Sequence, residues 1–155
     1  MQSLGLKITI CIIICLTLGF LSGISTAEAI RGWYATIQKP AWNPPNGIFG
    51  PVWSLLYCLM GISLALVWHQ KMTDKSMAYI FFAAQLALNL LWSFIFFKWQ
   101  SPGIALIEIM VMWCMILLTI LQFYNINKTS AYLLLPYLLW VSFATVLNAT
   151  IVYLN

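Results

Sequence analysis

The chain has 155 residues, of which 63% are hydrophobic and 6% are charged, and its mean hydropathy is +0.95. A soluble domain of this composition would aggregate, so the composition predicts an integral membrane protein. The net charge of +4 comes from isolated residues and short clusters, and the lack of a basic run excludes a nucleic-acid-binding surface.

Long uncharged intervals alternate with short charged clusters along the chain. A transmembrane helix needs about 20 apolar residues, and five intervals reach that length. We therefore expect an all-α integral membrane protein in which residues 1–155 form a single domain, a bundle of five transmembrane helices. The predicted helices span residues 6–28, 51–69, 77–98, 103–124 and 130–154, and a Pro- and Trp-rich loop over residues 31–50 joins the first two.

The first predicted helix has an alternative interpretation. Lys7, the apolar run after it and the small residues Ala27 and Ala29 imitate a secretory signal peptide with its cleavage site. The uncharged run is longer than the apolar core of a signal peptide, which favours a membrane span.

Small residues at helical spacing form smooth stripes on two of the helices. Gly19 and Gly23 on the first helix, and Ala83 and Ala87 on the third, permit close approach of another helix. For the first helix, packing within the bundle is the favoured interpretation and dimerisation the alternative. The stripe on the third helix offers a second dimer seam.

Three prolines mark helix boundaries or breaks. Pro51 and Pro102 are predicted to begin helices, because the first helical turn has no partner for the missing N–H. Pro136 lies inside the fifth predicted helix, where it should produce a kink that faces protein, since neighbouring helices can satisfy the freed carbonyl.

The segment from residue 33 to residue 61 is unusually dense in Trp, Pro and Gly. Proline fixes the backbone and indole rings favour the boundary between polar and apolar regions. This composition predicts a rigid, concave, aromatic surface that suits a flat apolar ligand.

Polar and aromatic residues within the spans share helix faces. Trp53 and Tyr57 lie four residues apart on the second helix, and two longer sets follow the same helical spacing on the third and fifth helices. The belt of interfacial tryptophans common to membrane proteins explains Trp33, Trp68 and Trp99 but leaves the rings on these faces unexplained. The two longer sets are Asn89, Trp92, Ser93 and Phe96, and Trp140, Ala144, Leu147 and Asn148.

Three polar side chains inside the spans need partners. Asn89 and Asn148 should point into the bundle, where each either joins helices or contacts a ligand, and joining helices is favoured for Asn148. Glu108 should snorkel toward the helix start or bond a neighbouring helix, and a proton relay is a weaker alternative because no second titratable partner is evident.

The sequence offers no group of residues that could perform conventional acid–base or nucleophilic catalysis. The four cysteines have no CxxC spacing, so neither disulfides nor a metal site is expected, and His69 is the only histidine. Three acids and one histidine cannot form a catalytic triad or an acid–base pair, and no nucleotide-binding motif is present.

Several spaced motifs together resemble the TspO/MBR family of tryptophan-rich sensory and translocator proteins. They are Trp33-Tyr34, Lys39-Pro40-x-Trp42-x-Pro44-Pro45, Phe49-x-Pro51-Val52-Trp53, Leu56-Tyr57, Met60-Gly61, Leu88-Asn89-x-x-Trp92-Ser93-x-x-Phe96-Phe97 and Trp140-x-x-Phe143-Ala144-Thr145-x-Leu147-Asn148. The motifs occur in the family's order, and the resemblance covers nearly the entire chain.

The resemblance implies a homodimer of five-helix bundles, each with a pocket capped by the loop between its first two helices. It implies binding of protoporphyrin IX and of benzodiazepine- or isoquinoline-type drugs, with no other cofactor required. It further implies light-dependent breakdown of protoporphyrin IX that involves Trp53 and Trp140. The implied ligand-binding residues are Tyr34, Phe49, Trp53, Tyr57, Asn89, Trp92, Ser93, Trp140 and Ala144.

Two alternatives to porphyrin breakdown stay open: passive transport of porphyrin, lipid or sterol, and a non-catalytic sensor. No basic residue follows Tyr153, which argues against the sterol motif of mitochondrial members, and the loose match from Leu121 through Tyr124 to Lys128 is expected by chance. The compact chain and this missing motif lead us to expect a bacterial plasma membrane.

Overall fold

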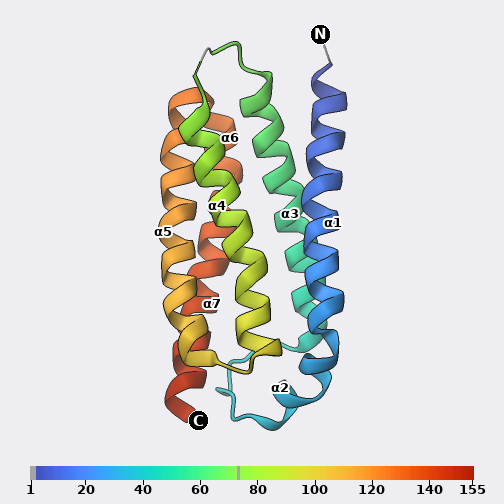
Figure 1. Ribbon diagram of the computed structural model, residues 1–155, viewed down its shortest axis with the longest axis vertical. Coiled ribbons are helices and arrows are strands. Elements are labelled where there is room, and N and C mark those ends of the chain that lie inside the picture. Colours follow the sequence, from blue (N-terminus) through green and yellow to red (C-terminus); the bar gives the residue numbers. More distant parts are fainter. Residues whose placement is uncertain (1–2, 73) are drawn as a thin grey trace.

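The computed structural model describes residues 3–72 and 74–155, and within these ranges every regular element is a helix. Five helical segments are long and apolar enough to cross a membrane, which confirms the predicted five-helix, all-α fold (Figure 1). The elements are α1 (Leu4–Arg31), α2 (Trp33–Thr36), α3 (Asn46–His69), α4 (Ser76–Ser93), the π-helical turn η1 (Phe94–Lys98), α5 (Pro102–Ile126), α6 (Lys128–Leu133) and α7 (Leu135–Leu154).

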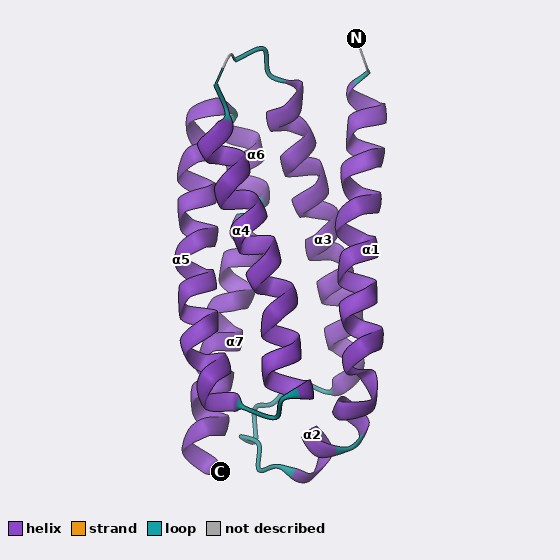
Figure 2. Cartoon of the chain, viewed as in Figure 1, coloured by secondary structure: helices purple, strands orange, loops and turns teal. Residues whose placement is uncertain are grey.

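The five spans run side by side along the long axis, and the two ends of the chain lie at opposite ends of the bundle (Figure 1). α1 packs on α3, α4 packs on α5, and α5 packs on α7. The short helix α2 and the loops around it cross the end of the bundle that also holds the C-terminus (Figure 2). Large apolar side chains such as Phe20, Ile107 and Leu139 are exposed on the outside, as a lipid-facing surface requires.

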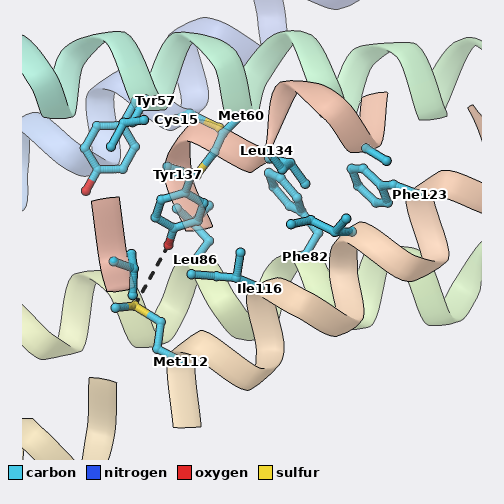
Figure 3. Close-up of a cluster of buried hydrophobic side chains, with 14 of the residues drawn as sticks. Cys15, Tyr57, Met60, Phe82, Leu86, Met112, Ile116, Phe123, Leu134 and Tyr137 are labelled. Carbon is cyan, nitrogen blue, oxygen red and sulfur yellow. Dashed lines mark hydrogen bonds between the residues drawn. The ribbon is translucent and has the colours of Figure 1, made fainter. Parts of the chain in front are cut away.

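The main apolar core fills the half of the bundle remote from α2. Phe82 near the start of α4 and Phe123 near the end of α5 stack with ring centroids 5.8 Å apart. Tyr137 of α7 is fully buried beside them, and its hydroxyl donates to the Met112 sulfur at 3.9 Å (Figure 3). The half nearer α2 holds a second, smaller apolar cluster around Phe96 and the cavity described below.

The second span begins earlier than the sequence predicts. α3 starts at Asn46, directly after Pro45, so Pro51 lies inside the helix and the prediction that it begins the helix is wrong. The extra turn brings Phe49 against Trp140, with ring centroids 6.1 Å apart, although Pro51 cannot donate the backbone hydrogen bond of an interior helical residue. Pro102 does begin α5, as predicted, with Ser101 as the residue before it.

The fifth span is interrupted where Pro136 predicts a break. α6 ends at Leu133, Leu134 has φ −90° and ψ −10°, and α7 begins at Leu135. Leu134 is buried in the core, whereas the ring of Pro136 lies on the exposed side.

The third span ends in a π-helical turn that the sequence pattern does not predict. In η1 the Trp99 N–H donates to the Phe94 carbonyl at 2.8 Å, five residues earlier instead of four. The wider turn changes the direction of the following side chains, and it places Phe96 and Phe97 against Tyr34 of α2 at centroid distances of 6.0 and 5.4 Å.

Candidate ligand cavity

A cavity of about 760 Å³ lies between α1, α3, α4, η1 and α7, at the end of the bundle that α2 covers. This volume falls within the range of small-molecule binding sites. None of the described residues that line it carries a formal charge, and most are apolar or aromatic. The cavity therefore suits an apolar ligand with few polar groups.

All nine residues implied as ligand-binding lie on the cavity wall, although they come from four separate segments. They are Tyr34 of α2; Phe49, Trp53 and Tyr57 of α3; Asn89, Trp92 and Ser93 of α4; and Trp140 and Ala144 of α7. The structure thus brings together every predicted site residue, while their roles in binding and in photochemistry stay predictions.

The aromatic side chains of the wall also contact one another. Trp92 stacks on Phe96 with centroids 5.0 Å apart, Trp53 lies 5.8 Å from Tyr57, and Trp140 lies 5.4 Å from Phe143. Such pairs hold the rings in fixed orientations. A flat ligand would meet a preformed aromatic surface in this cavity.

Two asparagines join the helices that carry the wall. The Tyr57 hydroxyl donates to Asn89 Oδ1 at 2.5 Å, and Asn89 Nδ2 donates to the Tyr137 hydroxyl at 3.0 Å, so Asn89 links α3, α4 and α7. Trp92 Nε1 donates to Asn148 Oδ1 at 3.2 Å, and Asn148 Nδ2 donates to the Pro102 carbonyl at 2.8 Å. The prediction that Asn148 joins helices is therefore confirmed. Asn89 both joins helices and lines the cavity.

The sequence analysis missed the contribution of α1, which supplies ten lining residues from Leu16 to Ile30. The stripe of small residues on this helix was the sequence feature that could have indicated it. Gly19 packs within the bundle as predicted, because a Cβ at this position would clash with the Tyr57 ring. Gly23 has open space around its Cα and lines the cavity. Ala83 and Ala87 are exposed on α4, and a dimer through that stripe stays a prediction.

Glu108 behaves differently from both main expectations. It is 8% exposed and lies outside the cavity, and neither of its carboxylate oxygens has a hydrogen-bond partner among the described residues. It therefore neither snorkels to the surface nor bonds a neighbouring helix. The interior position on α5, which packs against α4 and α7, places the side chain too deep for the snorkelling that we expected.

The cap is held together by its own polar contacts. The Tyr34 hydroxyl donates to Asn43 Oδ1 at 2.9 Å, and burial raises the pKa of this tyrosine. Lys39 Nζ donates to the carbonyls of Tyr34 and Ile37 at 2.6 and 3.0 Å and lies 4.9 Å from the centre of the Tyr34 ring. Trp42 packs against Phe143 of α7, with centroids 5.8 Å apart. These contacts fix α2 and its loop over the cavity.

The end of the chain also fastens this cap. The Gln38 N–H donates to Asn155 Oδ1 at 2.9 Å, and Asn155 Nδ2 donates to the Gln38 carbonyl at 3.0 Å. Asn155→Ala removes both bonds, so we expect the Gln38 amide to exchange with deuterium about tenfold faster in the variant. Hydrogen exchange with mass spectrometry measures this. Unchanged exchange across residues 33–45 would show that Asn155 does not hold the cap.

These features define a class: a five-helix, multi-pass integral membrane protein with an aromatic small-molecule cavity under a Pro- and Trp-rich cap. Comparison with known families identifies the family. The TspO/MBR family profile matches residues 11–154, and the chain belongs to this family.

Several named relatives match over most of the chain. The chain is 44% identical to the tryptophan-rich protein TspO of Chlorobaculum tepidum over 97% of this chain and 96% of the relative. It is 42% identical to the protein of that name from Archaeoglobus fulgidus, over 97% of each. The human translocator protein is 40% identical over 78% of this chain and 73% of its own length.

Proposed function

We propose that the cavity binds protoporphyrin IX and drug-like molecules of the benzodiazepine or isoquinoline type, and that bound protoporphyrin is degraded in light and oxygen. The observation that carries the proposal is the convergence of Trp53, Trp92 and Trp140, from three helices, on one aromatic cavity of about 760 Å³. In this function the protein limits damage by a photosensitising porphyrin.

The binding half of the proposal follows from shape and surface chemistry. A tetrapyrrole is a large, flat, mostly apolar plate, and its contact with indole and phenyl rings replaces exposed apolar surface. The wall supplies these rings in orientations fixed by ring–ring contacts, so little ordering is required when the ligand binds.

The photochemical half requires no conventional catalytic residue. Light absorbed by the porphyrin supplies the energy, and the excited ring can transfer energy to oxygen or exchange an electron with an adjacent indole. Trp53 and Trp140 are the indoles to which we assign this chemistry. Both rings line the cavity, and neither indole nitrogen donates a hydrogen bond within the described residues.

One observation favours passive translocation as the second candidate function. Phe20 and Ile24 line the cavity, yet they are 68% and 58% exposed, so the cavity reaches the lipid-facing surface of α1. A porphyrin or lipid could exchange with the bilayer there. Porphyrin flux into sealed vesicles that contain the protein tests this function, and flux equal to that of protein-free vesicles would exclude it.

Filling the cavity tests the binding proposal directly. Ala144→Phe places a phenyl ring into the space beside Trp140, so we expect protoporphyrin IX affinity to fall at least about tenfold. Quenching of tryptophan fluorescence in lipid nanodiscs measures the affinity. Val146→Phe is the matched control, because Val146 lies on the same helix but is 57% exposed. Equal binding by both variants would place the porphyrin site elsewhere.

A further inference from the structure

The cavity is exposed along one side, between α1 and α3. The described lining residues on α2, α4, η1 and α7 are all buried or half-buried. Every exposed one belongs to α1 or to the first half of α3, so the opening faces the lipid around these two spans. The exposed lining residues are Thr17, Phe20, Gly23 and Ile24 of α1 and Asn46, Gly50 and Ser54 of α3.

Close packing of α1 on α3 at one level contrasts with open space at another. At Gly61 a Cβ would lie 2.6 Å from the Ile12 Cα, so the two backbones touch there. The helices run in opposite directions (Figure 1), and Gly23 follows Ile12 by eleven residues. Gly50 precedes Gly61 by the same interval, about three helical turns, so Gly23 and Gly50 lie opposite each other near the same helix faces. No described atom of the facing helix lies within 4 Å of the position that a Cβ would take at either glycine, so the helices are separated at this level.

We call this opening the α1–α3 slot, and its surface is apolar. Neither glycine adds a side chain, and the Ser54 hydroxyl donates to the Gly50 carbonyl at 2.9 Å. An apolar molecule in the slot would therefore leave no side-chain polar group without a partner. The slot is bounded by Phe20, Gly23 and Ile24 of α1 and by Gly50 and Ser54 of α3.

Both ends of the slot are closed. Toward the main core, the Tyr57 ring packs so closely on α1 that a Cβ at Gly19 would clash with it. Toward the cap, Tyr34 is 3% exposed and its hydroxyl donates to Asn43. Passage through the slot therefore requires neither release of the cap nor separation of the helices where they touch.

We propose that the α1–α3 slot is the portal through which flat apolar molecules pass laterally between the bilayer and the cavity. The proposal rests on the proposed function, in which the cavity binds small molecules. It adds the route by which they enter and leave, and it assigns the rate of exchange to the missing side chains at Gly23 and Gly50.

A side chain placed in the slot tests the proposal. Gly50→Leu should slow association and dissociation of protoporphyrin IX about tenfold each and change its affinity by less than about twofold. An obstacle in a route raises the barrier equally for entry and exit, whereas loss of a contact mainly speeds exit. Gly47→Leu is the matched control, because Gly47 lies on the same helix with open space around it but does not line the cavity. Gly23→Leu should repeat the slowing from the opposite side of the slot.

Stopped-flow quenching of tryptophan fluorescence, after lipid nanodiscs that contain the protein are mixed with the probe, gives the association rate. A chase with excess empty nanodiscs gives the dissociation rate. The filled cavity of Ala144→Phe supplies the signal of probe that enters only the lipid. Pyrene, a flat hydrocarbon without polar groups, is the second probe, and the thermal midpoint of each variant shows whether the fold is retained.

Four results would overturn the proposal. They are absence of saturable binding of both probes, equal rates in Gly50→Leu and Gly47→Leu, faster dissociation of Gly50→Leu with unchanged association, and faster exchange in Asn155→Ala. The last result would place the route at the cap, which Asn155 fastens. Slowed pyrene exchange in Gly50→Leu without porphyrin binding would refute the porphyrin function alone, whereas porphyrin binding at unchanged rates would refute the portal alone.

Discussion

Simultaneous replacement of Trp53 and Trp140 by phenylalanine should abolish the light-dependent conversion of protoporphyrin IX while reducing its binding no more than a few-fold. Phenylalanine keeps an aromatic ring at each position and therefore most of the apolar contact area. It removes the indole, which is the electron-rich group that the proposed photochemistry uses. The two rings lie on α3 and α7 and both line the cavity, so a bound porphyrin can contact both.

The measurement is illumination of the purified protein with protoporphyrin IX, in air and without oxygen, while its absorbance and fluorescence spectra are recorded. We expect a new product spectrum only with wild-type protein, light and oxygen together. Trp99→Phe is the matched control, because Trp99 is 61% exposed and lies outside the cavity. If the double variant forms product at the wild-type rate, Trp53 and Trp140 are not catalytic. Saturable quenching without product in the wild-type protein would instead identify a non-catalytic binding protein or sensor.

The cavity wall on α3, α4 and α7 was predictable because polar and aromatic residues recur there at helical spacing within otherwise apolar spans. Asn89 and Trp92 illustrate the rule: three residues apart, they fall on one face and reach the same cavity. The wall on α1 was not predictable in this way. Lipid and an apolar cavity require the same residue types, so Phe20 on α1 could not be assigned to either by composition.

Other features depend on contacts between residues far apart in the sequence. The wide turn at Phe94 and the early start of α3 at Asn46 place aromatic side chains against distant partners, and no local motif specifies them. The pairing of Gln38 with Asn155 joins residues 117 positions apart. Helix number and helix faces follow from local periodicity, whereas the ends of the helices are decided by tertiary packing.

The pairing of α1 with α3 depends on Gly61, and Gly61→Ala should destabilise the protein by about 1–3 kcal/mol. A Cβ at this position would lie 2.6 Å from the Ile12 Cα and 2.7 Å from the Ile12 nitrogen. These are backbone atoms of α1, so no side-chain rotation can relieve the clash and the two helices must separate. Unfolding in mixed detergent and SDS micelles, followed by tryptophan fluorescence, measures the change.

Gly5→Ala separates this effect from helix propensity. Gly5 lies in the first turn of α1, and no atom lies within 4 Å of the position that an alanine methyl would occupy, so the substitution should be neutral or stabilise by up to about 1 kcal/mol. Equal stability of the Gly61 and Gly5 variants would show that α1 and α3 do not pack as closely as described. Because α1 also carries part of the cavity wall, separation of α1 from α3 should widen the cavity. Gly61→Ala should therefore weaken protoporphyrin IX binding as well as stability, whereas a variant that only removes a ligand contact would leave stability unchanged.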